Sequence, residues 1–118
     1  MSMKLENRVR LRLGNDIAMG PGKADLLDAI AATGSISAAA RQMNMSYRRA
    51  WLLVDAMNRC FRAPLVHSAV GGQQGGGATV TPEGHEVLRH FRAMERSAQQ
   101  ALQEHLAFFD AVLRTSAS

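Results

Sequence analysis

The run GSISAAARQMNMSYRRAW, from Gly34 to Trp51, decides the fold that we expect for this chain. Gly34 can end one helix, because glycine readily adopts left-handed backbone, and Ser35 or Ser37 can cap the next with a side-chain oxygen. Three alanines then allow a second helix to approach closely, and a short break precedes a further helix. Two helices at this spacing predict a helix-turn-helix, an arrangement that reads DNA in many proteins.

The second helix of this pair starts with Ser46 as its cap, so that Tyr47, Arg48 and Arg49 are the first side chains exposed. The first exposed residues of such a helix enter the major groove, where arginine suits phosphates and guanine edges. We therefore predict that double-stranded DNA is the partner. The side chains that we expect to contact it are Ser35, Ser37, Arg41, Ser46, Tyr47, Arg48, Arg49, Leu52, Gln73 and Gln74.

Helical spacing sorts the rest of this helix into two faces. Ala50, Val54 and Met57 share one face and should pack on the alanine-rich helix. Trp51 lies one turn after Tyr47 and is expected to be a buried boundary residue, the alternative being direct contact with DNA. Leu52 falls on the outer face, where it either meets a thymine methyl group or is an isolated surface leucine.

A glycine-rich hairpin is expected after these helices. Leu65–Ser68 has the composition of a short strand, VGGQQGGG at 70–77 that of a hairpin tip, and Ala78–Thr81 that of the returning strand. The tip is not a phosphate-binding loop, because no Lys-Ser or Lys-Thr pair follows it. The predicted fold is mainly α with a small β wing: a winged helix-turn-helix.

These residues resemble a known family, the amino-terminal DNA-binding domain of the ModE molybdate-responsive transcription regulators. The matching motifs are GSIS at 34–37, S-Y-basic-x-A-W at 46–51, the pair Met57 and Asn58, and the wing GG-x-x-GGGA that ends at Ala78. The similarity spans roughly residues 25–88, and a looser one to LysR-type helix-turn-helix domains covers the same region. The family tends to carry a lysine in the wing, where this chain has Gln73 and Gln74.

The resemblance also implies what this chain is not expected to do. Full-length members of the family carry a molybdate-binding region after the DNA-binding domain, whereas this sequence stops at Ser118. We therefore expect a reading head that lacks this region, does not bind molybdate and needs no cofactor. The resemblance implies a transcriptional regulator, and the alternative is a protein-interaction module that pairs with another regulator through its last helix.

The segment before the helix-turn-helix predicts a strand and a helix. Hydrophobic residues at 9, 11 and 13 alternate with Arg8, Arg10 and Arg12, which is the period of a half-buried strand with a basic outer face. We expect this strand to join the wing hairpin as its third member. A flexible connection, GNDIAMGPG at 14–22, should lead to a helix at about 23–33.

A long helix is expected from Pro82 to Leu113, with Thr81 as its cap. At 1.5 Å per residue it would extend about 48 Å, too far for one small domain to cover, so we expect a homodimer. The alternatives are a helix that folds back or one that breaks near Ala107. This division gives a DNA-binding domain at 1–81 and a dimerisation helix with a short tail at 82–118. The expected seam has coiled-coil spacing and consists of Val87, Phe91, Met94, Ala98, Ala101, His105, Phe108 and Val112.

Charge and composition narrow the function further. The formal net charge is +4, and residues 35–77 supply that excess with five arginines against Asp55. Such a concentration favours binding to a phosphate backbone, although a solvated arginine-rich surface would have the same composition. The sequence has no membrane-length apolar run and no signal-like start, which suggests a cytoplasmic protein.

The side chains that enzymes use do not cluster in this sequence. The four histidines lack metal-ligand spacing, so we expect no metal site. No base stands beside a plausible nucleophile, and the single cysteine, Cys60, is more easily explained as a small buried residue than as a reactive thiol. We therefore expect that the protein is not an enzyme.

Overall fold

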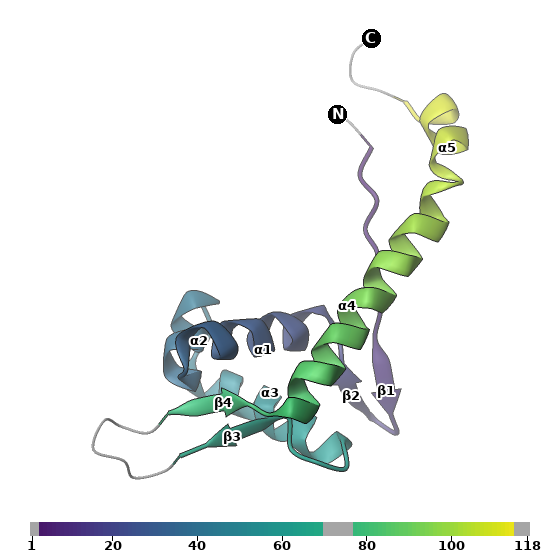
Figure 1. The fold of residues 1–118 in the computed structure, drawn as a ribbon. Coiled ribbons are helices and arrows are strands. Elements are labelled where there is room, and N and C mark those ends of the chain that lie inside the picture. The colour runs from purple at the N-terminus through teal and green to yellow at the C-terminus, as the bar shows by residue number, and fades with distance from the viewer. Residues whose placement is uncertain (1–2, 70–76, 115–118) are drawn as a thin grey trace.

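The computed structural model describes residues 3–69 and 77–114. Three helices and two small hairpins form a body from which a long helix projects (Figure 1). The elements follow in the order β1 (Leu11–Leu13), β2 (Asp16–Met19), α1 (Pro21–Thr33), α2 (Ile36–Gln42), α3 (Tyr47–Cys60), β3 (Val66–Ser68), β4 (Ala78–Val80), α4 (Pro82–Gln103) and α5 (Leu106–Val112).

The helix-turn-helix forms as the sequence predicts. Gly34 ends α1 in left-handed backbone, with φ of 72°, and its N–H donates to the carbonyl of Ile30. Ser35 caps α2 and Ser46 caps α3, each accepting a bond from a backbone N–H three residues on. Asn44 takes φ of 56° in the turn between them. The expectation for these two helices is confirmed.

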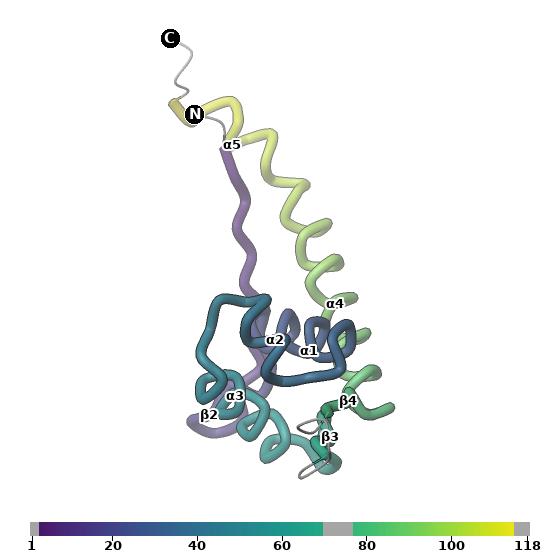
Figure 2. Tube along the Cα trace, turned by 90° about the vertical axis from the view of Figure 1, so that its left-hand side faces the viewer, coloured from purple at the N-terminus to yellow at the C-terminus, as the bar shows by residue number. Residues whose placement is uncertain are grey.

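One continuous core holds the body together. Its largest fully buried side chains come from β2, α1, α3, the loop before β3 and the first half of α4. Figure 2 shows these elements gathered in the body. Ala39, Ala40 and Ala50 are buried between α2 and α3, so these helices approach closely. The largest buried side chains are Phe91, Met19, Leu26, Leu27, Ile30, Met57, Leu65 and Val54.

The expected third strand of the wing is wrong. β1 pairs antiparallel with β2 in a hairpin of its own, separate from the β3–β4 sheet. The segment that we expected to be a flexible connection supplies the partner, because Gly14 turns the chain with φ of 60° and Met19 is completely buried beneath the helices. All three residues of β1 are exposed, so it is β2 that anchors this hairpin.

The wing is joined to the body by backbone and side-chain hydrogen bonds. Strands β3 and β4 pair antiparallel, with Val66 opposite Val80. The N–H of Ala78 donates to the carbonyl of Gly34 at 2.9 Å, which ties the wing to the end of α1. The predicted hairpin is thereby confirmed for its two strands, whereas residues 70–76 lie outside the described residues.

The first half of α4 belongs to the body. Thr81 caps it, accepting from the N–H of Gly84 at 2.9 Å and donating to the carbonyl of Pro64 at 2.7 Å. Leu88 and Phe91 are buried in the core. Arg92 donates to both Asp25 and Asp28 of α1, at 2.7 and 2.8 Å, and to Glu95. Burial alone would lower the pKa of the Arg92 guanidinium, but bonds to Asp28, Asp25 and Glu95 outweigh it and raise that pKa.

The last helix breaks near Ala107, as one of our alternatives allowed. Helix α4 ends at Gln103, Glu104 and His105 form a turn, and α5 continues to Val112. Beyond the body, α4 and α5 project in the same direction as the N-terminal segment (Figures 1 and 2). The radius of gyration is 17.9 Å, against about 13–14 Å for a compact domain of this length, so the molecule is elongated.

Candidate nucleic-acid interface

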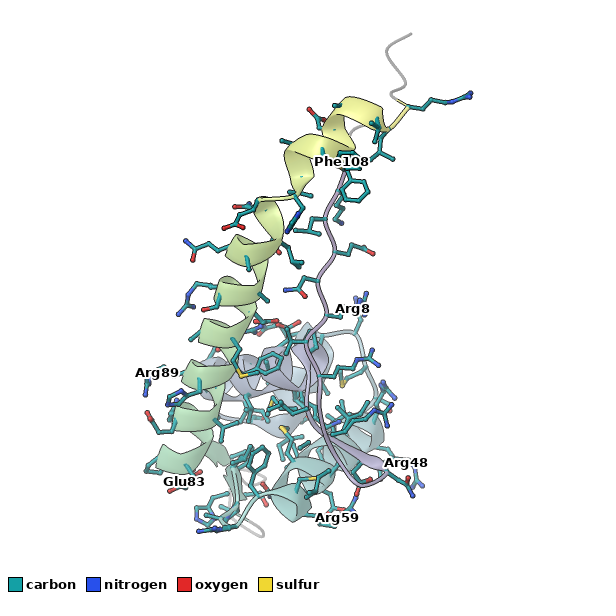
Figure 3. The ribbon with its side chains drawn as sticks, turned by 90° about the vertical axis from the view of Figure 1, so that its right-hand side faces the viewer. Arg8, Arg48, Arg59, Glu83, Arg89 and Phe108 are labelled. Carbon is teal, nitrogen blue, oxygen red and sulfur yellow. The ribbon has the colours of Figure 1, made fainter. Side chains whose placement is uncertain are left out.

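The first turn of α3 presents the side chains expected to contact DNA. Tyr47, Arg48 and Arg49 are all exposed, and Figure 3 shows Arg48 projecting from the surface. Among the described residues, no carboxylate lies within ion-pair distance of either arginine. Ser46 accepts from the N–H of Arg49 at 3.0 Å, so its hydroxyl oxygen is engaged in capping the helix. The tip therefore carries two cations whose charge is not cancelled within the described protein.

Tyr47 and Trp51 form a pair along the outer side of α3. Their rings meet edge to face, with centroids 6.4 Å apart, and the indole N–H of Trp51 donates to the hydroxyl of Tyr47. Trp51 is half-buried and packs against the core, so our expectation of a buried boundary residue is met in part. This contact fixes the direction of the tyrosine, which is 52% exposed.

Beyond its first turn, α3 carries an exposed leucine and, near its end, an arginine whose charge is balanced by carboxylates. Leu52 is 57% exposed and lies on the same side as the tip. Further along, Arg59 contacts Asp55 at 3.1 Å and Asp16 of β2 at 3.7 Å, so its charge is balanced there. Positive charge without a partner is thus concentrated at the start of α3, not along its whole length.

Helix α2 contributes a short polar cluster beside α3. Ser35 accepts from the N–H of Ala38 at 3.1 Å, which commits its oxygen to the helix cap. The guanidinium of Arg41 donates to the hydroxyl of Ser37 at 3.0 Å, one turn earlier on the exposed face. Ser37 therefore orients Arg41, a relationship that sequence spacing permits but does not specify.

The other expected DNA contacts are in the wing. Gln73 and Gln74 lie outside the described residues. The described strands end with Ala69 donating its N–H to the carbonyl of Gly77 at 2.8 Å, so the hairpin ladder continues to the edge of this gap. The wing and α3 are connected through Asn58, whose side chain bonds to the backbone of Leu65 and Val66. We had noted Asn58 only as part of a motif and had assigned it no role.

The expected dimerisation residues fall into two groups. Phe91 is 1% exposed and lies in the core of its own body, so assigning it to a seam between chains was wrong. Val87 is half-buried and packs on the same core. Helical spacing alone could not reveal this, because Val87 and Phe91 share one face of α4 with the later positions, and only the fold shows how far along that face the core extends. The remaining positions lie beyond the body, with Ala98 half-buried and the others exposed: Met94, Ala98, Ala101, His105, Phe108 and Val112.

The side chains that could carry chemistry do not gather in the described structure. Within residues 3–69 and 77–114, no three of His, Cys, Asp and Glu come together as metal ligands would. Cys60 is half-buried, not fully buried as expected. Over the same residues, no helix has both the length and the apolar composition needed to cross a membrane.

Comparison with protein families matches residues 23–85 to the bacterial regulatory helix-turn-helix proteins of the lysR family. Similar curated proteins include the molybdenum-pterin-binding protein MopB of Rhodobacter capsulatus, 46% identical over 71% of this chain and 31% of the relative. The molybdenum transport protein ModE of Azotobacter vinelandii is 39% identical over 79% of this chain and 35% of its own length. The DNA-binding transcriptional dual regulator ModE of Escherichia coli K12 is 33% identical over 84% of this chain and 38% of its own length. The chain thus spans about a third of these relatives.

A solved structure with a similar fold is full-length CbnR in complex with its target DNA. The two superpose with a TM-score of 0.56 at 20% sequence identity, over 73% of this chain and 28% of CbnR. At this identity the likeness concerns the fold alone. It confirms the winged helix-turn-helix architecture that the residues predicted, and the curated relatives confirm the separate resemblance to ModE regulators.

Proposed function

We propose that this chain, which belongs to the lysR family of bacterial regulatory helix-turn-helix proteins, is a sequence-specific DNA-binding transcriptional regulator that acts as a homodimer. One observation carries the proposal most directly: the first turn of α3 holds Arg48 and Arg49, both exposed, with no carboxylate of the described residues paired to them. That tip begins the second helix of the helix-turn-helix, the end from which such helices enter the major groove.

Each exposed side chain of the tip has a role in this proposal. Arg48 and Arg49 enter the major groove and donate to guanine edges or to phosphates. Trp51 holds the Tyr47 side chain in one orientation. The tyrosine hydroxyl can therefore contact the DNA backbone without losing further side-chain freedom on binding. Leu52 provides an apolar surface for a thymine methyl group. Ser35 and Ser46 act mainly by fixing the two helices, whereas Ser37 holds Arg41 toward a phosphate.

The homodimer rests on the part of α4 and α5 that leaves the body. Met94, Phe108 and Val112 are 40%, 63% and 61% exposed there, which is unusual for large apolar side chains unless another surface covers them. A second copy would bury this stretch and hold two reading heads about 34 Å apart, one turn of DNA. In this proposal residues 1–81 with the first turns of α4 read DNA, and the remainder of 82–118 forms the seam.

The apolar end also supports the second candidate, a protein-interaction module. Phe109 and Leu113 are exposed beside Phe108, so another regulator could be the partner that covers them. We retain molybdenum metabolism as a candidate regulated process, because the relatives are named for molybdenum transport and pterin binding. In our proposal this chain acts in the bacterial cytoplasm, and its residues read DNA without themselves binding molybdate.

Gel-shift titration of the purified protein tests the proposal. Duplexes are first selected from a random pool, and binding of a recovered duplex is compared with binding of a scrambled one at moderate salt. We expect discrete shifted bands and a clear preference for the selected sequence. A folded protein that shifts no duplex would refute the reading function and favour the interaction module.

A further inference from the structure

A hollow of about 260 Å³ lies beside the tip of α3, where the N-terminal segment, β2, the start of α1 and the turn before α3 meet. Its apolar wall consists of Ile17, Met45 and Leu53. Its polar lining consists of four basic side chains, and no acidic residue takes part. Those four are Arg8, Arg10, Lys23 and Arg49.

Three separate segments bring these cations together. Arg8 and Arg10 precede β1, Lys23 lies in the first turn of α1, and Arg49 lies in the first turn of α3. Among the described residues, none of the four lies within ion-pair distance of a carboxylate. Figure 3 labels Arg8, which lies on the N-terminal segment above the body. Like charges that line one hollow repel each other, so the cluster is stabilised when an anion joins it.

The electrostatics of Lys23 support this view. Lys23 is half-buried, and desolvation lowers its pKa, with the charges of Arg49 and Arg10 acting in the same direction. Cys60 and Asp16 act in the opposite direction without reversing the shift. Desolvation and like charges both disfavour a cation, and an anion placed between these groups would offset both.

The start of α1 closes one side of the hollow. Gly20 caps this helix without a side chain, so no side-chain oxygen accepts from the first N–H groups of α1. The Cγ atom of Arg10 lies 3.5 Å from the position that a Cβ would take at Gly20, so the arginine stem crosses the helix start. Free N–H groups there carry partial positive charge and add to that of the four side chains.

We propose that this hollow binds a phosphate group of the DNA backbone, beside the groove that α3 enters. The inference rests on the proposed function, because Arg49 belongs to both the hollow and the reading tip. A backbone phosphodiester is favoured over a free oxyanion because three of the four cations are exposed, so water and salt compete for them. A phosphate held by the rest of the interface does not have to overcome that competition alone.

The proposed phosphate site assigns a role to the β1–β2 hairpin, which is to position the arginines that precede it. In this proposal the arginines at positions 8 and 10, which precede β1, reach the DNA because β1 pairs with β2, and the buried Ala18 and Met19 anchor β2 in the body. The contact is to phosphate, so it positions the protein without reading sequence. Removal of this phosphate contact should therefore weaken selected and scrambled duplexes alike, whereas removal of a base contact should weaken mainly the selected one.

Salt-dependent binding of Lys23→Gln and Arg10→Gln to the selected and scrambled duplexes tests this. Removing one phosphate contact should reduce the slope of log K against log salt by about 0.9 per subunit. Lys23→Arg keeps the charge and should retain the slope, and Lys4→Gln, which removes a lysine charge outside the hollow, should leave it unchanged. The thermal unfolding midpoint of each variant is compared with that of the wild type to check that the fold is intact.

The outcomes separate the competing explanations. A wild-type protein that binds DNA, with Lys23→Gln and Arg10→Gln slopes equal to that of Lys4→Gln, overturns the inference and leaves the proposed function standing. A wild-type protein that binds no DNA overturns both. Calorimetry with inorganic phosphate, and separately with molybdate, tests whether the hollow binds a free oxyanion instead of a DNA phosphate. Saturation by either at micromolar concentration, with an unchanged DNA slope, would assign the hollow to a free oxyanion and overturn the DNA assignment.

Discussion

The side-chain oxygen of Asn58, near the end of α3, accepts a hydrogen bond from the backbone N–H of Leu65 at 2.8 Å. The same oxygen accepts from the N–H of Val66 at 3.2 Å, and the Asn58 amide donates to the Val66 carbonyl at 3.2 Å. One side chain thus satisfies three backbone groups at the start of the wing. Helix α3 and the wing are thereby held in a fixed relative position.

Replacing Asn58 with alanine should therefore destabilise the protein. Three partly buried backbone groups would be left without their partner, and leaving buried polar groups unsatisfied costs about 1–3 kcal/mol. Urea denaturation measures the destabilisation as a lower midpoint. Asn58→Asp keeps the accepting oxygen but removes the donor, so it should be less damaging than Asn58→Ala. Equal midpoints for wild type and Asn58→Ala would show that the wing is held by other contacts.

Gly84 should not tolerate even a methyl group. An added Cβ would lie 2.3 Å from the carbonyl oxygen of Leu65 and 2.7 Å from a methyl carbon of Val80, so the backbone would have to move. Overpacking of this kind costs about 1–3 kcal/mol. Gly22→Ala, where nothing lies within 4 Å of the added atom, is the matched control and should be neutral or mildly stabilising. Thermal melting of the two variants decides the matter, and identical melting curves would contradict the close approach.

Replacement of Arg48 and Arg49 distinguishes base reading from phosphate contact. An arginine that reads a base should cost about 1–3 kcal/mol on the selected duplex when changed to alanine, with little effect on a scrambled one. An arginine that contacts phosphate should weaken both duplexes equally. Circular dichroism should stay native, because both side chains are exposed. Undiminished affinity in the double variant would remove α3 from the interface.

The wing should respond to charge. Gln73 and Gln74 lie outside the described residues, and we expect a neutral supporting contact from them. Gln73→Lys should tighten binding to any duplex and steepen the salt dependence by roughly one charge per subunit. Gln73→Glu, a matched change of opposite charge, should weaken binding to any duplex. If both variants keep the wild-type slope, the wing lies away from the phosphates.

A charge in the seam should separate the proposed dimer. Ala98 is half-buried, and a second copy over α4 would bury a glutamate placed there without a partner. Ala98→Glu should shift the protein from dimer to monomer and greatly reduce affinity for a duplex with two half-sites. Gln103→Glu adds the same charge on the opposite face of the helix and should remain dimeric. Light scattering at micromolar concentration measures the mass, and a dimeric Ala98→Glu would place the seam elsewhere.

Local signals were enough to predict the helix-turn-helix and the wing. Gly34, Ser35 and Ser46 act on backbone groups within a few residues, so their roles as helix end and caps follow from residue type and spacing. The inner face of α3 followed from helical periodicity in the same way, and Ala50, Val54 and Met57 are all buried. Thr81 and Pro82 likewise marked the start of α4.

Contacts between distant parts of the chain were beyond such reasoning. The alternation at residues 8–13 indicated a strand but not its partner. Only the tertiary structure shows that it pairs with β2, because β2 is held in place by Met19, which is buried in the core. Phe91 has the spacing of a seam residue, yet the body reaches far enough along α4 to bury it. The hollow that includes Lys23 and Arg49 likewise requires α1 and α3 to be placed side by side, and the sequence between these two residues carries no signal for that.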